Sequence, residues 1–193
     1  MQKYLQESAI IDISHPLIQA KAIALTSQNE SDLETARNCF VFVRDKIRHT
    51  GDANDNFTTC KASDVLTKES GWCFAKAHLL TALLRANNIP CGISYQRLSI
   101  DDKGAPYSLH GLNAIYLKDF GWYRVDARGN KEGVNAQFNP PHEQLAFSFE
   151  ERDINEGDFS KIYVDPLDVV VCALQTHTTI KAMRANFPDQ ELC

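Results

Sequence analysis

The chain has 193 residues, a formal net charge of -5 and 44% hydrophobic residues. These values are typical of a globular protein of ordinary domain size, so we expect a single α+β domain over residues 1–193. The acidic balance offers no attraction to nucleic acid or to an anionic membrane, and neither is expected as a partner. No apolar run approaches the roughly 20 residues that a membrane-spanning helix needs, and residues 1–14 lack the apolar core of a secretory signal.

Cysteine spacing excludes two common kinds of site. The six cysteines are Cys39, Cys60, Cys73, Cys91, Cys172 and Cys193. None forms a CxxC pair, which argues against a zinc site or a redox motif, so we expect no metal and no other cofactor. Cys39, Cys91 and Cys172 lie in apolar runs and are expected to be buried and inert. Free thiols suit a reducing compartment, which predicts a cytoplasmic protein.

The first 70 residues carry capping and periodicity signals. We expect a short strand at residues 8–14 (SAIIDIS) and a helix from Pro16 to about Leu25, with proline in its first turn. Ser31 and Glu34 have the spacing of a capping box, and apolar residues recur at helical spacing behind them to about residue 48. Residues 50–60 are expected to form a loop, and Ser63 is expected to cap a short helix.

Residues 73–86 form the most apolar segment of the chain. Because this segment is apolar nearly all round, it predicts a helix that is buried on most sides. Gly71 breaks the chain before it, and Pro90 forbids its continuation. The expected elements that follow are a strand at 91–100, a turn at 101–106, strands at 109–117 and 121–126 joined by KDFG, a loop at NPP, a strand and an apolar stretch of ambiguous type within 161–175, and a polar helix at 176–186.

Cys73, at the start of the expected buried helix, is the candidate nucleophile. A thiol reacts as its thiolate, and a helix N-terminus and a nearby imidazolium are the commonest devices that lower its pKa. The free amides of the first helical turn can also stabilise an oxyanion. The alternative is a buried thiol that serves only in packing.

His110 and Asp126 lie on the two strands of an expected hairpin. A carboxylate behind an imidazole fixes its tautomer and stabilises its positive charge. Two residues of a hairpin share a face when the sum of their numbers has the same parity as the sum for the residues that pair across the strands. His110 and Asp126 have an even sum, whereas a four-residue loop at 118–121 would give paired residues an odd sum and would place these two side chains on opposite faces. The pairing therefore requires a three- or five-residue loop, or a bulge. Asp126 is also compatible with a solvated carboxylate at a strand end.

The other histidines are weaker candidates. His78 lies five residues after Cys73, which is roughly 140° away around a helix, so we expect it to pack elsewhere. His49 ends the helix before the expected cleft and is kept as a second candidate. Spacing suggests no carboxylate partner for the remaining three histidines.

The runs GWCFAKAHLLTALLRANNIPCGISY and LHGLNAIYLKDFGWYRVDARGN resemble the core of the transglutaminase-like superfamily. That family has Cys at a helix start, His on one strand, and Asp closing the next strand after a Trp, which correspond here to Cys73, His110, Asp126 and Trp122. FVRDKIRH, ASDVL, FNPPHEQLAF and YVDPL extend the resemblance over about residues 30–170. Asn88 stands where the family commonly has Gly, and Asn can adopt the same backbone.

The resemblance implies a papain-like α+β fold, with the cysteine helix packed on an antiparallel sheet, and Cys-His-Asp acyl transfer. We therefore expect Cys73 to attack a carbonyl carbon, His110 to move the proton and Asp126 to orient His110. Hydrolysis of an amide or peptide bond, in a peptide, protein or small amide substrate, is the favoured reaction. An amine acyltransferase of transglutaminase or arylamine-acetyltransferase type is the first alternative, and a binding module without turnover is the second.

Trp72 and Trp122 flank the expected site in the sequence. They are candidate substrate-binding residues, because two large aromatic side chains could wall a tunnel that excludes water. Simple core packing is the alternative for both.

Overall fold

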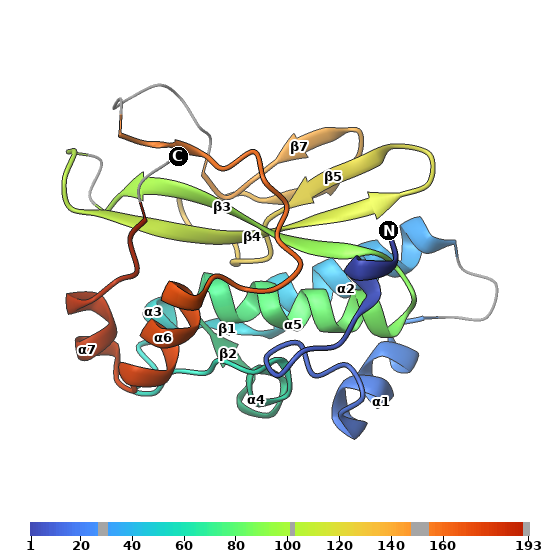
Figure 1. The fold of residues 1–193 in the computed structure, drawn as a ribbon, viewed down its shortest axis with the longest axis horizontal. Helices are drawn as coiled ribbons and strands as arrows, with labels where there is room; N and C mark the ends of the chain where they lie inside the picture. Colours follow the sequence, from blue (N-terminus) through green and yellow to red (C-terminus); the bar gives the residue numbers. More distant parts are fainter. Residues whose placement is uncertain (27–30, 101–102, 148–154, 191–193) are drawn as a thin grey trace.

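The computed structural model of the protein describes residues 1–26, 31–100, 103–147 and 155–190. Its helices lie in one layer beneath a curled antiparallel sheet (Figure 1). The helical elements are η1 (Gln2–Leu5), α1 (Pro16–Ala24), α2 (Asp32–Lys46), α3 (Thr50–Ala53), α4 (Ala62–Lys68), α5 (Cys73–Ala86), α6 (Asp168–Thr176) and α7 (Ile180–Ala185). The strands are β1 (Arg48–His49), β2 (Ser70–Gly71), β3 (Cys91–Ser99), β4 (Tyr107–Leu117), β5 (Gly121–Val125), β6 (Gln137–Asn139), β7 (His142–Gln144) and β8 (Gly157–Asp158).

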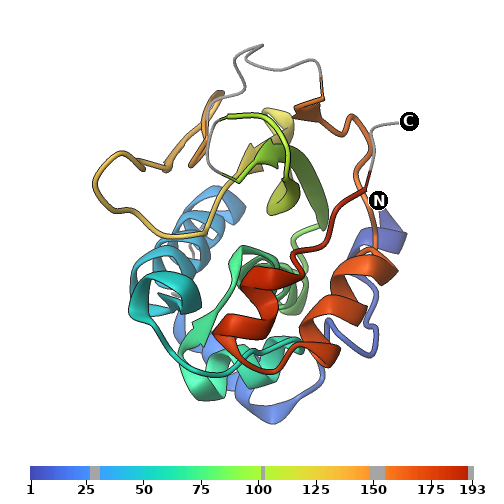
Figure 2. The same cartoon turned by 90° about the vertical axis from the view of Figure 1, so that its left-hand side faces the viewer.

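Helix α5 is the centre of the core. Every residue from Cys73 to Arg85 is buried, as the apolar pattern of this segment predicts. The helix contacts α1, α2 and α4 on its helical side and β3 and β4 on its sheet side. Figure 2, turned by 90°, shows the other helices around α5 and the sheet above it. The fold is therefore α+β, with the cysteine helix packed on an antiparallel sheet.

The main sheet has the strand order β5-β4-β3-β8. Strand β4 pairs with β5 from Asn113↔Val125 to Leu117↔Gly121, so the connecting turn contains only residues 118–120. This three-residue turn gives an even register sum, which satisfies the condition for His110 and Asp126 to share a face. The loop of four residues that the sequence suggested is one residue too long, because Gly121 already belongs to β5.

The predicted caps are confirmed in part. Ser31 and Glu34 form the capping box of α2, with both reciprocal hydrogen bonds present. Helix α4, however, begins before Ser63. The carboxylate of Asp12 accepts hydrogen bonds from the Ser63 backbone amide (3.1 Å) and hydroxyl (2.5 Å), so a distant segment caps this helix.

Three local predictions are wrong. Residues 8–14 contain no strand, because their backbone bonds to the start of α4, where Ala62 N donates to Ile10 O over 3.0 Å. Residues 50–53 form the short helix α3 instead of a loop. Cys39 and Cys91 are buried as expected, but Cys172 is exposed, because it lies on a part of α6 that does not face the core.

The remaining expectations concern single segments. Asn88 has a φ of 59°, the left-handed conformation that allows Asn to stand in for Gly. The expected strand near residue 163 is reduced to one isolated bridge, between Tyr163 and Ile93. The expected turn at 101–106 falls partly outside the described residues. Among the helices that the structure describes, none has both the length and the apolar character that membrane crossing requires.

Candidate active site

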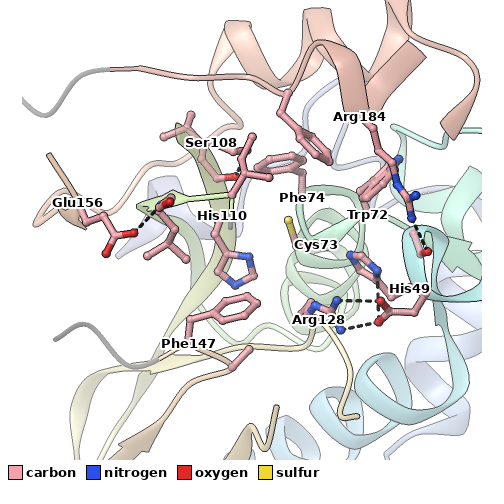
Figure 3. Close-up of a pocket in the computed structure, with 18 of the residues that line it drawn as sticks. His49, Trp72, Cys73, Phe74, Ser108, His110, Arg128, Phe147, Glu156 and Arg184 are labelled. Atoms are coloured by element: carbon pink, nitrogen blue, oxygen red, sulfur yellow. Dashed lines mark hydrogen bonds and ion pairs between the residues drawn. The ribbon is translucent and has the colours of Figure 1, made fainter. Parts of the chain in front are cut away.

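A pocket of about 560 Å³ lies at the N-terminus of α5, where β4 passes over it. Side chains from β1, α5, β4, the segment after β5 and α7 line this pocket (Figure 3). Cys73 and His110 are both among them. The pocket thus gathers parts of the chain that are far apart in the sequence around one thiol.

Cys73 is the first residue of α5, and the residue before it, Trp72, is the N-cap with extended backbone (φ -63°, ψ 164°). No side chain caps this end of the helix, so the amides of its first turn remain free to stabilise negative charge. Gly71 allows the preceding strand to come close to the helix, since a Cβ there would lie 3.1 Å from the Cβ of Ala75. Cys73 as a whole residue is 9% exposed and lines the pocket.

His110 and Asp126 form a buried pair. Nε2 of His110 lies 2.6 Å from Oδ2 of Asp126, and the two residues are 5% and 0% exposed. Asp126 also accepts hydrogen bonds from the backbone amides of Arg128 (3.0 Å) and Ala146 (3.1 Å). Three hydrogen bonds therefore fix the carboxylate of Asp126. The other ring nitrogen of His110, Nδ1, is not engaged by Asp126 and is available to the Cys73 thiol.

Glycine at position 111 brings β4 close to the start of α5. A Cβ at Gly111 would lie 2.9 Å from Cδ1 of Phe74 and 3.1 Å from its Cα. Contacts this short are rarely tolerated in a packed core, so only glycine fits without displacing the helix. The neighbouring residue, His110, is thereby placed beside Cys73.

The charges at the site favour an ion pair. Burial disfavours the Cys73 thiolate, but the charge and hydrogen bond of His110 outweigh it and lower the pKa of the thiol to about 6. Burial also opposes a charged His110, yet the charges of Asp126 and Cys73 raise its pKa to about 10. The pKa of Asp126 is lowered despite its burial, because His110 is charged and the hydrogen bonds favour the carboxylate. A thiolate beside an imidazolium is the reactive form of a cysteine nucleophile.

The profile of the Transglutaminase-like superfamily matches residues 19–127. The chain belongs to this superfamily. The matched range contains Cys73, His110 and Asp126, in the order in which the family resemblance places them.

Two solved structures show how far the likeness extends. A structure described as a candidate cysteine protease from Cytophaga hutchinsonii has a TM-score of 0.52 and 21% identity, over 65% of this chain and 40% of that one. A structure described as a TGase has a TM-score of 0.42 and 16% identity, over 70% of this chain and 35% of that one. The first likeness shows a shared fold, and this chain spans less than half the length of either protein. No curated protein matches the chain.

The two tryptophans of this transglutaminase-like protein occupy different places. Trp72 lines the pocket, and its ring makes edge contacts with His49 (5.3 Å between centroids) and Phe187 (5.3 Å). Trp122 packs against Tyr4 and Tyr116 instead, and the structure does not bring it to this pocket. The sequence suggested that Trp122 lies near the site because it stands four residues before Asp126, but residues along and just after one strand can reach separate parts of the sheet.

Two charged residues of the pocket lining, Asp52 and Arg128, were missed by the sequence analysis. Arg128 donates two hydrogen bonds to the carboxylate of Asp52 (2.6 and 3.0 Å), and Lys131 donates a third (2.9 Å). Asp52 stands three residues after His49, a spacing that could have suggested a partner for that histidine. Arg128 stands two residues after Asp126, but no local signal links it to Asp52, which is 76 residues away in the sequence.

His78 has the packing role that its position on α5 predicts. Its Nδ1 lies 2.8 Å from the carbonyl oxygen of Cys60, and burial lowers the pKa of the imidazole to about 4. Within the described ranges, no cluster of three or more His, Cys, Asp or Glu side chains is arranged to hold a metal ion.

Proposed function

We propose that the protein is a cysteine-dependent acyl-transfer enzyme that uses Cys73 as nucleophile, His110 as general acid and base, and Asp126 to orient His110. The observation that carries the proposal is the buried pair of His110 and Asp126, joined over 2.6 Å beside a thiol at a helix N-terminus. The superfamily of the chain is consistent with this chemistry. A binding module without turnover would have no need of a buried charged pair aimed at a thiol.

The reaction proceeds in two halves. The Cys73 thiolate forms a bond to the carbonyl carbon, and the carbonyl oxygen takes up the negative charge near the free amides of the α5 N-terminus. The carbon–nitrogen bond of the amide then breaks, and the proton of the His110 imidazolium goes to the leaving amine. A thioester on Cys73 remains. In the second half, His110 removes a proton from the acceptor as it attacks the thioester, and Cys73 leaves as thiolate.

We propose water as the acceptor. Polar and charged side chains form much of one wall of the pocket, including His49, Asp52 and Arg128. Trp122 lies elsewhere, so the two tryptophans do not join into an apolar tunnel that would exclude water. An amine acyltransferase remains the alternative, and the reaction products distinguish the two.

The acyl-enzyme can be trapped with a simple activated ester. We expect p-nitrophenyl acetate to release a burst of about one nitrophenolate per chain and to leave an acetyl group on the peptide that contains Cys73, because the thiolate is formed near neutral pH. The burst should vanish in Cys73→Ala. The burst is measured by absorbance and the acetyl group by peptide mass spectrometry.

Cys172 provides the matched control, because its thiol is exposed and lies outside the pocket lining. Cys172→Ala should keep the full burst. Acetylation of Cys172 in the wild-type chain, with Cys73 unmodified, would contradict the proposal. Added primary amine should leave free acetate as the main product, and an excess of acetylated amine would reassign the acceptor.

A further inference from the structure

A second imidazole faces Cys73. His49 lines the pocket from β1, with its side chain 10% exposed and its ring packed against the edge of Trp72. Figure 3 shows the sulfur of Cys73 between the imidazoles of His49 and His110, which lie on opposite sides of it. The thiol therefore has a nitrogen donor on each side.

The position of His49 is fixed from its backbone. Strand β1 pairs with β2 in parallel, with His49 opposite Gly71, two residues before Cys73. The buried amine of Lys76, one turn into α5, donates hydrogen bonds to the carbonyl oxygens of Ile47 (2.5 Å) and Arg44 (3.2 Å). The cysteine helix thus holds the segment that leads into His49.

A carboxylate also orients the ring of His49. Nδ1 of His49 lies 3.5 Å from Oδ2 of Asp52, an ion pair when the ring is protonated, and Arg128 and Lys131 hold that carboxylate in place. This contact turns the other ring nitrogen, Nε2, toward the thiol. The backbone amide of Arg128 also bonds to Asp126, so one arginine links the carboxylates behind both imidazoles.

We propose that His49 is a further catalytic residue, whose protonated ring faces Asp52 through Nδ1–H and donates a hydrogen bond from Nε2–H to the carbonyl oxygen of the substrate as that oxygen becomes negative. The inference rests on the proposed acyl-transfer function. His110 must protonate the leaving group, so the leaving group lies on the His110 side of the sulfur. The carbonyl oxygen then turns to the other side, where His49 and the first amides of α5 are the available donors.

The indole N–H of Trp72, another residue that lines the pocket, is a competing donor. Its nitrogen is buried and has no hydrogen-bond partner among the described residues. His49 is partly exposed to the pocket and can therefore reach a bound carbonyl group. The carbonyl oxygen is thus assigned to His49 and not to Trp72.

Two roles of His49 can be separated by experiment. The pKa of the Cys73 thiol reflects burial first and the charge of His110 second, with a smaller lowering by the hydrogen bond and charge of His49. Alkylation by iodoacetamide needs only the thiolate, because no carbonyl oxygen becomes negative at the reacting carbon. Acylation by p-nitrophenyl acetate needs both the thiolate and an oxyanion donor. The charged groups around His49 are Asp52, Cys73, Arg128 and Lys131.

The test compares both reactions in His49→Ala, His49→Gln and the wild type at about pH 6, below the ordinary pKa of a histidine and near the pH at which the Cys73 thiolate forms. For His49→Ala we expect acylation of Cys73 to slow by about 100-fold, as for loss of one oxyanion donor, while alkylation stays within about 3-fold of the wild type. His49→Gln retains an N–H donor and should recover at least about 10-fold of the lost acylation rate. His142→Ala, an exposed histidine on β7, should change neither rate.

Each outcome of this comparison either supports or contradicts the role of His49. Wild-type acylation rates in His49→Ala, or equal losses of acylation and alkylation, would overturn the role of His49 while leaving the proposed function intact. A wild-type chain that is alkylated at Cys73 but never acylated would overturn the proposed function itself, and this inference with it. Thermal unfolding at the wild-type temperature would show that the variants remain folded.

Discussion

Replacing His110 with alanine is expected to lower the rate of acyl transfer by roughly 10,000-fold or more, the size of effect seen when one member of a catalytic triad is lost. The substitution removes the charge and hydrogen bond that oppose the burial of the Cys73 thiolate. It also removes the proton donor for the leaving amine. The pKa of the Cys73 thiol should rise toward the value set by burial, as it does at Cys60, where burial raises the pKa to about 11.

The measurement is the acylation rate of Cys73 by p-nitrophenyl acetate across a pH series. In the wild type, we expect acylation to increase as the pH rises through about 6, where the thiolate forms. Because nitrophenolate leaves without a proton, this rate should not fall near pH 10, where His110 loses its proton; with an amide substrate, whose leaving amine needs that proton, the rate should fall there. In His110→Ala, the pH at which acylation begins to increase should be higher by several units, because the thiolate forms only at that higher pH. A variant with wild-type rates near neutral pH would show that another group activates the thiol.

Asp126→Asn is expected to reduce acyl transfer by about 10,000-fold as well, because the tautomer of His110 would no longer be fixed. The carboxylate accepts hydrogen bonds from His110, Arg128 and Ala146, whereas an amide has one oxygen and adds an N–H₂ group. At least one buried donor would lose its acceptor, which costs about 1–3 kcal/mol in the free energy of unfolding.

Asp119→Asn is the control for that change, since Asp119 is exposed in the turn of the same hairpin. Thermal unfolding and acylation rates should both stay at wild-type values in the control. The pKa of Asp126 is lowered by folding, so its contribution to stability is present above the unfolded pKa and is lost as the pH falls through the folded one. The free energy of unfolding of Asp126→Asn should therefore change less than that of the wild type as the pH falls into the acid range. An unchanged pH dependence would contradict the lowered pKa of Asp126.

Local signals were enough to predict the central part of the fold. The all-round apolar pattern of residues 73–86, with Gly71 before it and Pro90 after it, marked α5 at its observed bounds. The strands at residues 91–99, 107–117 and 121–125 were also foreseen to within two residues. These elements are defined by periodicity and by breaking residues, both of which are local properties of the chain.

Long-range partners explain what the sequence did not reveal. The strand expected at residues 8–14 failed because Asp12 bonds to Ser63, which no local pattern shows. The pairing of His110 with Asp126 depended on a turn of three residues, and the letters KDFG are compatible with three or four. Asp52 and Arg128 meet only because α3 and the segment after β5 converge on the pocket. A single domain, a cytoplasmic location and the absence of nucleic-acid partners remain predictions.

The ionisation of Cys73 tests the central claim most directly. Ultraviolet absorbance of the thiolate, taken as the difference between the wild type and Cys73→Ala over a pH series, gives the pKa of this one thiol in the folded protein. The account predicts a midpoint near 6, with a thiolate already formed at neutral pH. A midpoint at or above about 8.5, the ordinary value for a cysteine, would contradict it.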